Sequence, residues 1–237
     1  MKIPEFFRSE IGNTLLISIA VVILFFLAIF IFVKPSFPSA EFATSQTPLV
    51  PVSQLLISSG EHYSYTFKSA NETSNFSFQV ISDKGNCMQI KAIYFLETPA
   101  RVDACLNKSN GVALNALLTY ENNTAPAGNW SAEFAQPWML AVTENWSWQV
   151  NSSLLVPNWG VEQKEVTTFK FVGEEVIKGR EAYKVHLLVQ FLDSSIESGR
   201  IESDYWIDKE TRVLLLVKSD MSSMELTSAP FNLTSGN

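Results

Sequence analysis

The feature that most constrains this chain is an uninterrupted apolar run, Leu15–Val33. Its nineteen residues include no charge, proline or glycine, and Lys34 and Pro35 follow it directly. A helix of this length rises about 1.5 Å per residue and extends roughly 28 Å, close to the ~30 Å hydrocarbon core of a bilayer. A helix on the surface of a soluble domain would carry a polar stripe, which this run lacks. The run therefore predicts a single-pass transmembrane helix in the cell membrane, with a cleaved secretory signal as the alternative.

Asparagine sequons predict which side of the membrane holds the rest of the chain. Chance alone predicts about 2.6 Asn-x-Ser/Thr sequons from this content of asparagine, serine and threonine, but the chain has eight, all after the apolar run. We therefore expect residues 1–14 in the cytoplasm and an exported, N-glycosylated remainder, with accidental sequons on an Asn-rich surface as the alternative. The sequons begin at Asn71, Asn75, Asn107, Asn122, Asn129, Asn145, Asn151 and Asn232.

The two cysteines agree with export. Cys87 and Cys105 both follow the apolar run, and an even count in an exported domain predicts a disulfide, here between neighbouring strands. Two free buried thiols are the alternative. Neither a CxxC motif nor a Cys/His cluster is present, so we expect no metal site.

Changes in composition and periodicity suggest the domain organisation. Residues 34–53 are rich in proline, serine and threonine and are expected to form an extended stalk. Residues 54–237 alternate apolar and polar side chains, which predicts a β-rich exported domain. Short helices are expected at Gln54–Ser59 and Pro137–Asn145. An antiparallel meander is clearest in four predicted strands, Glu165–Val176, Arg180–Leu192, Gly199–Ile207 and Val213–Ser219.

Residues Ser109–Gln163 contain no Lys or Arg but hold five of the six tryptophans. One interpretation is an aromatic-lined groove for a glycan or a lipid. The favoured interpretation is that tryptophan side chains seal a helix or loop against the sheet. The tryptophans are Trp130, Trp138, Trp146, Trp148 and Trp159.

Catalytic and nucleic-acid chemistry is not indicated. After Lys34 the chain has 14 Lys and Arg against 22 Asp and Glu, and this acidic balance disfavours nucleic acid as a partner. The chain lacks the GxSxG, SxxK, GxxxxGK[ST] and HExxH motifs, so we expect neither an enzyme nor a cofactor. The alternation of its strand makes His186 an ordinary outward strand residue. Carboxylates at Glu202, Asp204, Asp208 and Glu210 are expected to form a solvated polar face.

Two segments near the C-terminus resemble the LolA-like group, the lipoprotein-carrier and lipoprotein-sorting superfamily. They are Gly179–Tyr183 and Tyr205–Thr211, which match a Gly-x-x-Ala/Tyr strand and a Trp-Ile/Val-Asp-x-x-Thr hairpin. Asp208 and Thr211 also have a plain structural interpretation, as caps of the turn. The resemblance implies a curved antiparallel sheet, an incomplete barrel whose apolar interior receives acyl chains. The side chains expected to face such a ligand are Tyr183, Val185, Leu187, Val189, Phe191, Val213 and Leu215.

The predicted fold class is therefore mainly β, with an N-terminal transmembrane helix, an incomplete barrel and a few short helices. The predicted function is that of a membrane-anchored extracytoplasmic glycoprotein domain that binds a lipidic or hydrophobic ligand, a lipoprotein or a partner protein. The alternative is a structural or adhesive surface protein with pilin-like assembly. Pro35 and Pro38 argue against that alternative, because a pilin stem continues beyond the membrane. An apolar cavity would favour ligand binding, and a filled core would favour the alternative. The oligomeric state stays open.

Overall fold

The computed structural model describes residues 41–70, 72–95, 98–128, 130–156, 161–194 and 199–234. These residues form one antiparallel sheet of 13 strands in the order β1-β8-β9-β10-β11-β12-β13-β2-β3-β4-β5-β6-β7. The strands are β1 (Glu41–Gln46), β2 (His62–Ser69), β3 (Thr73–Asp83), β4 (Cys87–Phe95), β5 (Ala100–Asn107), β6 (Ala113–Tyr120), β7 (Asn123–Pro126), β8 (Ser147–Val156), β9 (Val161–Ile177), β10 (Arg180–Ser194), β11 (Arg200–Asp208), β12 (Leu214–Lys218) and β13 (Ser222–Ser228).

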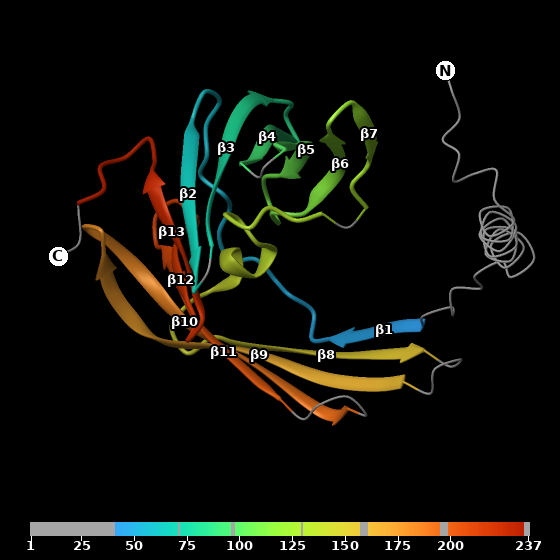
Figure 1. The fold of residues 1–237 in the computed structure, drawn as a ribbon. Helices are drawn as coiled ribbons and strands as arrows, with labels where there is room; N and C mark the ends of the chain where they lie inside the picture. The colour runs from blue at the N-terminus through green and yellow to red at the C-terminus, as the bar shows by residue number, and fades with distance from the viewer. Residues whose placement is uncertain are drawn as a thin grey trace, which may run out of the picture.

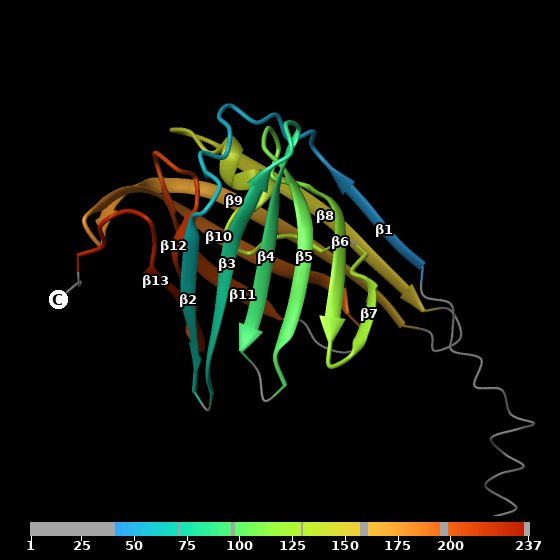
Figure 2. The same ribbon diagram turned by 90° about the horizontal axis from the view of Figure 1, so that it is seen from above.

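The sheet bends into two arms (Figures 1 and 2). Strands β2–β7 form one arm, β8–β11 with β1 form the other, and the short strands β12 and β13 join them. The phenol of Tyr65 donates to the carbonyl oxygen of Leu214 at 2.7 Å, which fixes β2 to the start of β12 at this junction. Register shifts in the β9–β10 and β11–β12 pairs add twist, as β-bulges do.

Alternating side chains explain the arm formed by β2–β7. Tyr63 lies opposite Phe78 and Tyr65 opposite Phe76, so the aromatic residues of both strands share one face. All four side chains are buried. We call this face of the sheet, which lies between the two arms, the inner face, and the opposite one the outer face. Because successive side chains of a strand alternate between faces, the pattern fixes the register of the hairpin.

A segment between β7 and β8, residues 130–146, fills the space between the arms (Figure 1). It contains the 3₁₀ helix η2 (Pro137–Ala141). Phe134 has no exposed surface and stacks on Phe78, with ring centroids 4.3 Å apart. Trp138 packs on Phe169 of the other arm at 4.8 Å. The segment therefore joins the two arms into one hydrophobic core. We call residues 130–146 the core segment.

The predicted fold class was wrong in its helical parts. In the described ranges, η2 is a single short 3₁₀ helix where Pro137–Asn145 was expected to be helical, and Gln54–Ser59 is not helical. No helix among the described residues is long and apolar enough to cross a membrane. The predicted transmembrane helix, Leu15–Val33, lies outside the described residues, as do residues 1–14. One large open sheet takes the place of the expected incomplete barrel with helices.

Other sequence predictions about the β-rich part hold. The four strands of the C-terminal meander are present as β9, β10, β11 and β12.

The predicted stalk was wrong in one part. Glu41–Gln46 pair along their whole length with β8 as strand β1. The run Phe42–Gln46 has no proline or charge, so it can join a sheet, whereas the prolines that suggested a stalk flank it.

Candidate functional site

Most of the predicted ligand-facing residues are part of the packed core. Val185 lies opposite Phe171 of β9 and Tyr205 of β11, and it has no exposed surface. Trp138 of the core segment contacts Tyr205 edge-on, with ring centroids 5.3 Å apart. Val213 and Leu215 are fully buried, while Tyr183, Leu187, Val189 and Phe191 are partly exposed. The core segment therefore occupies the space that the resemblance assigns to an acyl chain.

The tryptophans of this region support the interpretation that they seal the core segment against the sheet. Trp138 stacks on Trp146 at 6.2 Å. Trp130 donates its indole N–H to the phenol oxygen of Tyr94 at 3.2 Å, and Trp148 donates to the carbonyl of Thr47 at 2.9 Å. Trp159 lies outside the described residues.

The hairpins that carry the LolA-like resemblance fix turns and hold the core segment. Asp208 is almost fully buried and accepts hydrogen bonds from the Arg180 guanidinium at 2.7 and 3.1 Å and from the amide of Glu210 at 2.8 Å. Arg212 donates to the carbonyl of Val142 in the core segment at 2.7 Å. Burial lowers the pKa of the Arg212 guanidinium. Asp208 was expected on a solvated face, so this expectation was wrong.

Gly179 and Thr211, in the turns of the same hairpins, differ in what they contribute. Gly179 has φ +77°, and a Cβ there would lie 2.8 Å from the hydroxyl of Thr234, so the turn needs glycine. Thr211, expected to cap the turn, has a buried hydroxyl oxygen without a hydrogen-bond partner. Asp208 caps the turn alone, since it accepts from the amides of Glu210 and Thr211.

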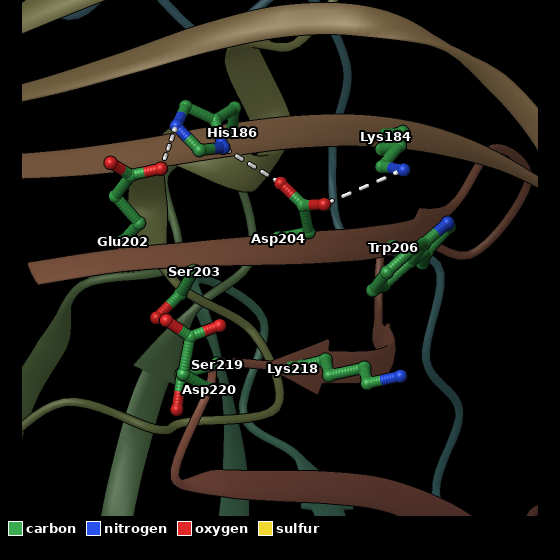
Figure 3. A pocket seen from close by; sticks show the side chains of 9 residues that line it. All are labelled: Lys184, His186, Glu202, Ser203, Asp204, Trp206, Lys218, Ser219 and Asp220. Carbon is green, nitrogen blue, oxygen red and sulfur yellow. Dashed lines mark hydrogen bonds and ion pairs between the residues drawn. The ribbon is translucent and has the colours of Figure 1, made fainter.

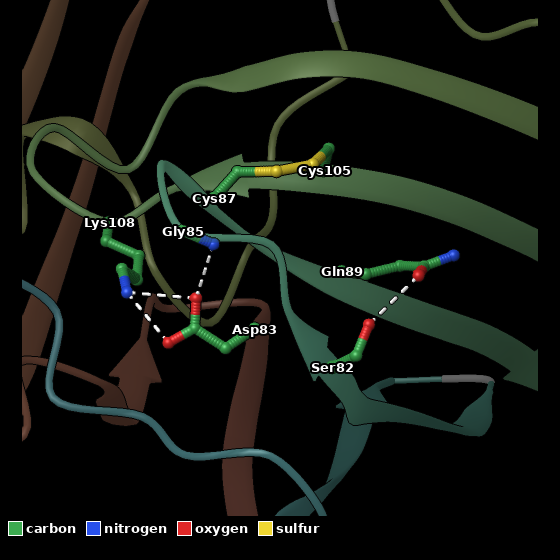
Figure 4. The surroundings of a disulfide bond; sticks show 7 residues. All are labelled: Ser82, Asp83, Gly85, Cys87, Gln89, Cys105 and Lys108. Atoms are coloured by element: carbon green, nitrogen blue, oxygen red, sulfur yellow. Dashed lines mark hydrogen bonds and ion pairs between the residues drawn. A yellow bond between two sulfur atoms is a disulfide. The ribbon is translucent and has the colours of Figure 1, made fainter.

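The predicted disulfide is confirmed. Cys87 on β4 and Cys105 on β5 are joined, with Cα atoms 5.6 Å apart (Figure 4). The adjoining β3–β4 turn is fixed by Asp83, which accepts from the amide of Gly85 at 2.8 Å and pairs with Lys108 at 2.9 Å. The Lys108 ammonium lowers the pKa of Asp83.

The sequon asparagines lie where a glycan could be attached without entering the core. Those that the structure describes are exposed, except that Asn107 is half-exposed. Its carboxamide oxygen accepts from the hydroxyl of Ser109, the third residue of its own sequon, at 2.8 Å. Asn71 and Asn129 lie outside the described residues, and the others are Asn75, Asn122, Asn145, Asn151 and Asn232.

The outer face carries a polar groove of about 420 Å³ at the junction of β10, β11 and β12 (Figure 3). We call it the outer groove. It is lined by Lys184 and His186 of β10, by Glu202, Ser203, Asp204 and Trp206 of β11, and by Lys218, Ser219 and Asp220 at the end of β12.

The outer groove forms because β11 and β12 separate. Strand β11 pairs with β10 over its whole length, but with β12 only from Asp204, which lies opposite Lys218. Among the described residues, Arg200–Ser203 therefore have no strand on the β12 side. The amide of Phe191 donates to the carbonyl of Gly199, so the backbone groups of Gly199 point toward β10. In an antiparallel ladder this direction alternates along the strand, so Ile201 and Ser203 also point their backbone groups toward β10. The backbone groups of Arg200 and Glu202 point into the opening.

Charged side chains alternate across the groove (Figure 3). Nδ1 of His186 lies 2.8 Å from Asp204, and its Nε2 lies 3.5 Å from Glu202. Nζ of Lys184 lies 3.4 Å from Asp204. Lys218 and Asp220 form no ion pair with any described residue and are exposed at the opposite rim. The groove thus offers charges of both signs to a bound molecule.

A second set of contacts fixes the floor of the groove. Lys184 pairs with Glu175 of β9 at 3.1 Å and lies 4.9 Å from the centre of the Trp206 ring. The hydrogen bond with Glu175 raises the pKa of Lys184. Hydrogen bonds from Trp206 and then from Lys184 lower the pKa of Glu175, so both groups stay charged at neutral pH. Strands β9, β10 and β11 are therefore cross-linked on their outer face.

The arrangement suits binding of polar groups. No three His, Cys, Asp or Glu side chains in the part of the chain that the structure describes are placed to hold a metal ion. His186 and the neighbouring carboxylates were expected on solvated strand faces. These residues alternate along two paired strands, so the sequence could have predicted that their side chains meet on one face. The groove itself could not be predicted, because no local sequence signal marks where β12 ends.

Comparisons with known proteins show a partial likeness of fold. No family model matches the sequence, and no curated protein sequence matches it. A chain of the Pseudomonas aeruginosa MucA/MucB complex has a TM-score of 0.39 and 10% identity, and the alignment covers 75% of this chain and 53% of the other. This chain thus spans about half the length of that structure.

Two further structures align over most of their own length. One is a protein described as exported, with a YmcC-like fold, from Bacteroides fragilis, with a TM-score of 0.38, 9% identity and coverage of 76% of this chain and 100% of that chain. The other is the lipoprotein YmcC of Escherichia coli, with a TM-score of 0.37, 15% identity and coverage of 74% and 90%. With TM-scores of 0.37–0.39 and identities of 9–15%, these likenesses carry no conclusion about the family of this chain. The LolA-like resemblance stays a prediction from the sequence.

Proposed function

We propose that this chain is an extracytoplasmic binding domain whose outer groove takes an extended segment of a partner protein. The observation that carries the proposal is the unpaired edge of β11 at Arg200–Ser203, beside a groove of about 420 Å³. Free backbone donors and acceptors can pair with another extended chain, and alternate side chains of that chain would then meet pockets on either side.

The charges of the outer groove support a polypeptide partner. Lys218 and Asp220 at one rim are available for ion pairs, and Glu202 and Asp204 line the other. A protein segment can satisfy charges of both signs together with backbone groups, which an acyl chain cannot. Charge pairing of this kind sets orientation and association rate more than affinity.

The filled interior favours a protein partner over a lipidic ligand. Phe134 and Trp138 of the core segment join the arms and are almost fully buried. A lipid could enter only if these side chains left the core. Exposing each of them would cost about 1.5–3 kcal/mol of burial free energy.

Export is supported by the disulfide and by the sequons. A disulfide between Cys87 and Cys105 persists in an oxidising compartment. The sequon asparagines that the structure describes are accessible at the surface. Protease added to intact cells should therefore digest residues 41–234, and protection of this domain until the membrane is broken would contradict the proposed location.

Site-specific photo-crosslinking tests partner binding. A photoreactive residue at position 220, at the groove rim, should give an adduct of one defined mass in intact cells, and the same residue at position 84, in the β3–β4 turn, should not. Lys218→Glu should abolish the adduct from position 220, whereas Lys84→Glu should leave it unchanged. Both lysines are exposed, so neither change should affect folding. Equal adducts from positions 220 and 84, or none from position 220, would reject the proposal.

A further inference from the structure

The two edges of the sheet differ in how they are protected. Strand β7 has four residues, Asn123–Pro126, and ends in a proline, which cannot donate to a further strand. Strand β1 has six residues, pairs with β8 on one side, and has no strand on its other side among the described residues. Ala43, Thr44, Ser45 and Gln46 are all exposed. From position 42 to 46 the strand contains no charge and no proline.

An edge of this kind is a template for another strand. Natural sheets protect exposed edges with charged residues, prolines, bulges or very short strands, because unpaired N–H and C=O groups recruit other chains. Strand β1 has none of these devices after Glu41, and its register with β8 runs without a bulge. The indole of Trp148 holds the following residue, Thr47, by its carbonyl at 2.9 Å. The open edge is therefore kept straight and in place.

We propose that β1 pairs antiparallel with β1 of a second copy of this chain, with the twofold axis midway between the two Thr44 residues. In an antiparallel ladder, two opposed residues either both point their backbone N–H and C=O groups toward the partner strand or both point them away. Because successive residues of a strand alternate between these two states, residues that oppose one another in self-pairing must differ by an even number of positions. The axis must then lie between one residue and its own copy in the partner. An axis between the two Thr44 residues places Ala43 opposite Ser45 and residue 42 opposite Gln46.

Residues 42–46 carry no charge, so two copies of β1 can pair without electrostatic repulsion. In this register Thr44 faces Thr44, a favoured cross-strand pair, and no like charges face one another. Glu41 lies beyond the five paired residues. The contact is isologous, so it closes on itself and gives a dimer, not the filament of a pilin-like assembly. A single strand pair is small, so the dimer should be weak and dependent on concentration.

This proposal is independent of the outer groove. Strands β8, β9 and β10 separate β1 from β11, and the edge lies at the end of the arm farthest from β12 (Figures 1 and 2). Pairing at β1 would leave Lys218 and Asp220 accessible. Failure of either proposal would therefore not affect the other.

Cysteine crosslinking of the full chain tests the register. Cα atoms of opposed residues lie about 4.5–5.5 Å apart, within the 4.4–6.8 Å range of disulfides. Thr44→Cys should therefore form a disulfide-linked dimer under mild oxidation. Ala43→Cys should crosslink much less, because its counterpart is Ser45, and Thr124→Cys on the β7 edge should not crosslink. Dimer from Thr124→Cys as readily as from Thr44→Cys would indicate random collision and reject the proposal.

Sedimentation of the full chain tests association without crosslinking. The unaltered chain should show a monomer–dimer equilibrium. Thr44→Lys, which opposes two ammonium groups at the axis, should weaken dimerisation at least tenfold, and Thr124→Lys should leave it unchanged. A chain that is monomeric at all concentrations, or a dimer that Thr44→Lys leaves intact, would overturn the proposal.

Discussion

The indole N–H of Trp206 on β11 donates to the carboxylate of Glu175 on β9, 2.8 Å away, across the intervening strand β10. Lys184 of β10 lies between them and pairs with the same carboxylate at 3.1 Å. Three strands thus share one contact on their outer face, beside the outer groove. The contact fixes β11 at Trp206, which pairs with Leu216 of β12, close to the open edge at Arg200–Ser203.

Removal of the Trp206–Glu175 hydrogen bond should measure this coupling. Trp206→Phe keeps most of the ring, and Glu175→Gln keeps an acceptor but removes the charge. In a double-mutant cycle of urea unfolding we expect a coupling free energy of about 0.5–1.5 kcal/mol, because the bond is charge-assisted but Glu175 is partly exposed. Additive effects of the two substitutions would show that the contact does not contribute to stability.

The half-buried carboxylate of Glu133 in the core segment should give a pH dependence of stability opposite to that of most acids. Glu133 accepts from the Tyr94 phenol at 3.0 Å, and burial raises its pKa. A raised pKa in the folded state means that the stabilisation is complete below the unfolded pKa and is lost as pH rises through the folded pKa. Glu133→Gln, which cannot ionise, should therefore be more stable than the unaltered chain at pH 7.

The difference in unfolding free energy between Glu133→Gln and the unaltered chain should shrink as the pH falls below about 4.5, where the unfolded-state carboxyl is also protonated. Glu121→Gln, at an exposed position in the β6–β7 turn, is the matched control. Denaturant unfolding measured from pH 4 to pH 8 would check the trend. A gap between Glu133→Gln and the unaltered chain that stays constant over this range would contradict it.

The disulfide should contribute measurably to stability. It closes a loop with a sequence separation of 18 residues, for which chain entropy predicts about 3 kcal/mol. Alkylation of the denatured, unreduced protein should label no thiol, and labelling after reduction should reach two. The paired change Cys87→Ala with Cys105→Ala should lower the free energy of unfolding by about that amount. Two labelled thiols before reduction would show that the bond does not form.

Local alternation was enough to predict several strands and turns. Tyr183, Val185 and Leu187 alternate with polar residues in the sequence, and they face the core as expected. The Gly179 turn follows from a backbone that only glycine adopts easily. These features depend on neighbours within a few residues, so the sequence displays them directly.

Long-range pairing could not be predicted in the same way. Ser222 lies opposite Ser69, and Thr44 lies opposite Ser152, but nothing near either residue indicates its partner. The outer groove depends on β11 extending beyond β12, a difference between two strands and not a motif of either. The interior is filled by Phe134 and Trp138, and aromatic side chains like these occur both in ligand-binding grooves and in packed cores. Only the packing of both arms on them decides between these alternatives.

Truncation of Phe134 tests whether the core segment is a fixed part of the core. Its ring lies between Phe78, 4.3 Å away, and Tyr63, 5.5 Å away, and the carbonyl of the same residue accepts from the amide of Leu214 at 2.9 Å. Phe134→Ala should therefore cost about 3–5 kcal/mol of unfolding free energy. Val189→Phe, at a partly exposed inner position, should cost less than the ~1–3 kcal/mol of overpacking expected in a closed core.

Native mass spectrometry of the same proteins completes this test. A fixed core segment predicts that no lipid co-purifies with the unaltered chain or with Val189→Phe. If Phe134→Ala instead costs less than about 1 kcal/mol, and lipid co-purifies with the unaltered chain but not with Val189→Phe, the segment moves out of the core to admit a ligand. The inner face would then be a binding site, and the outer groove would lose the argument that favours a protein partner over a lipidic ligand.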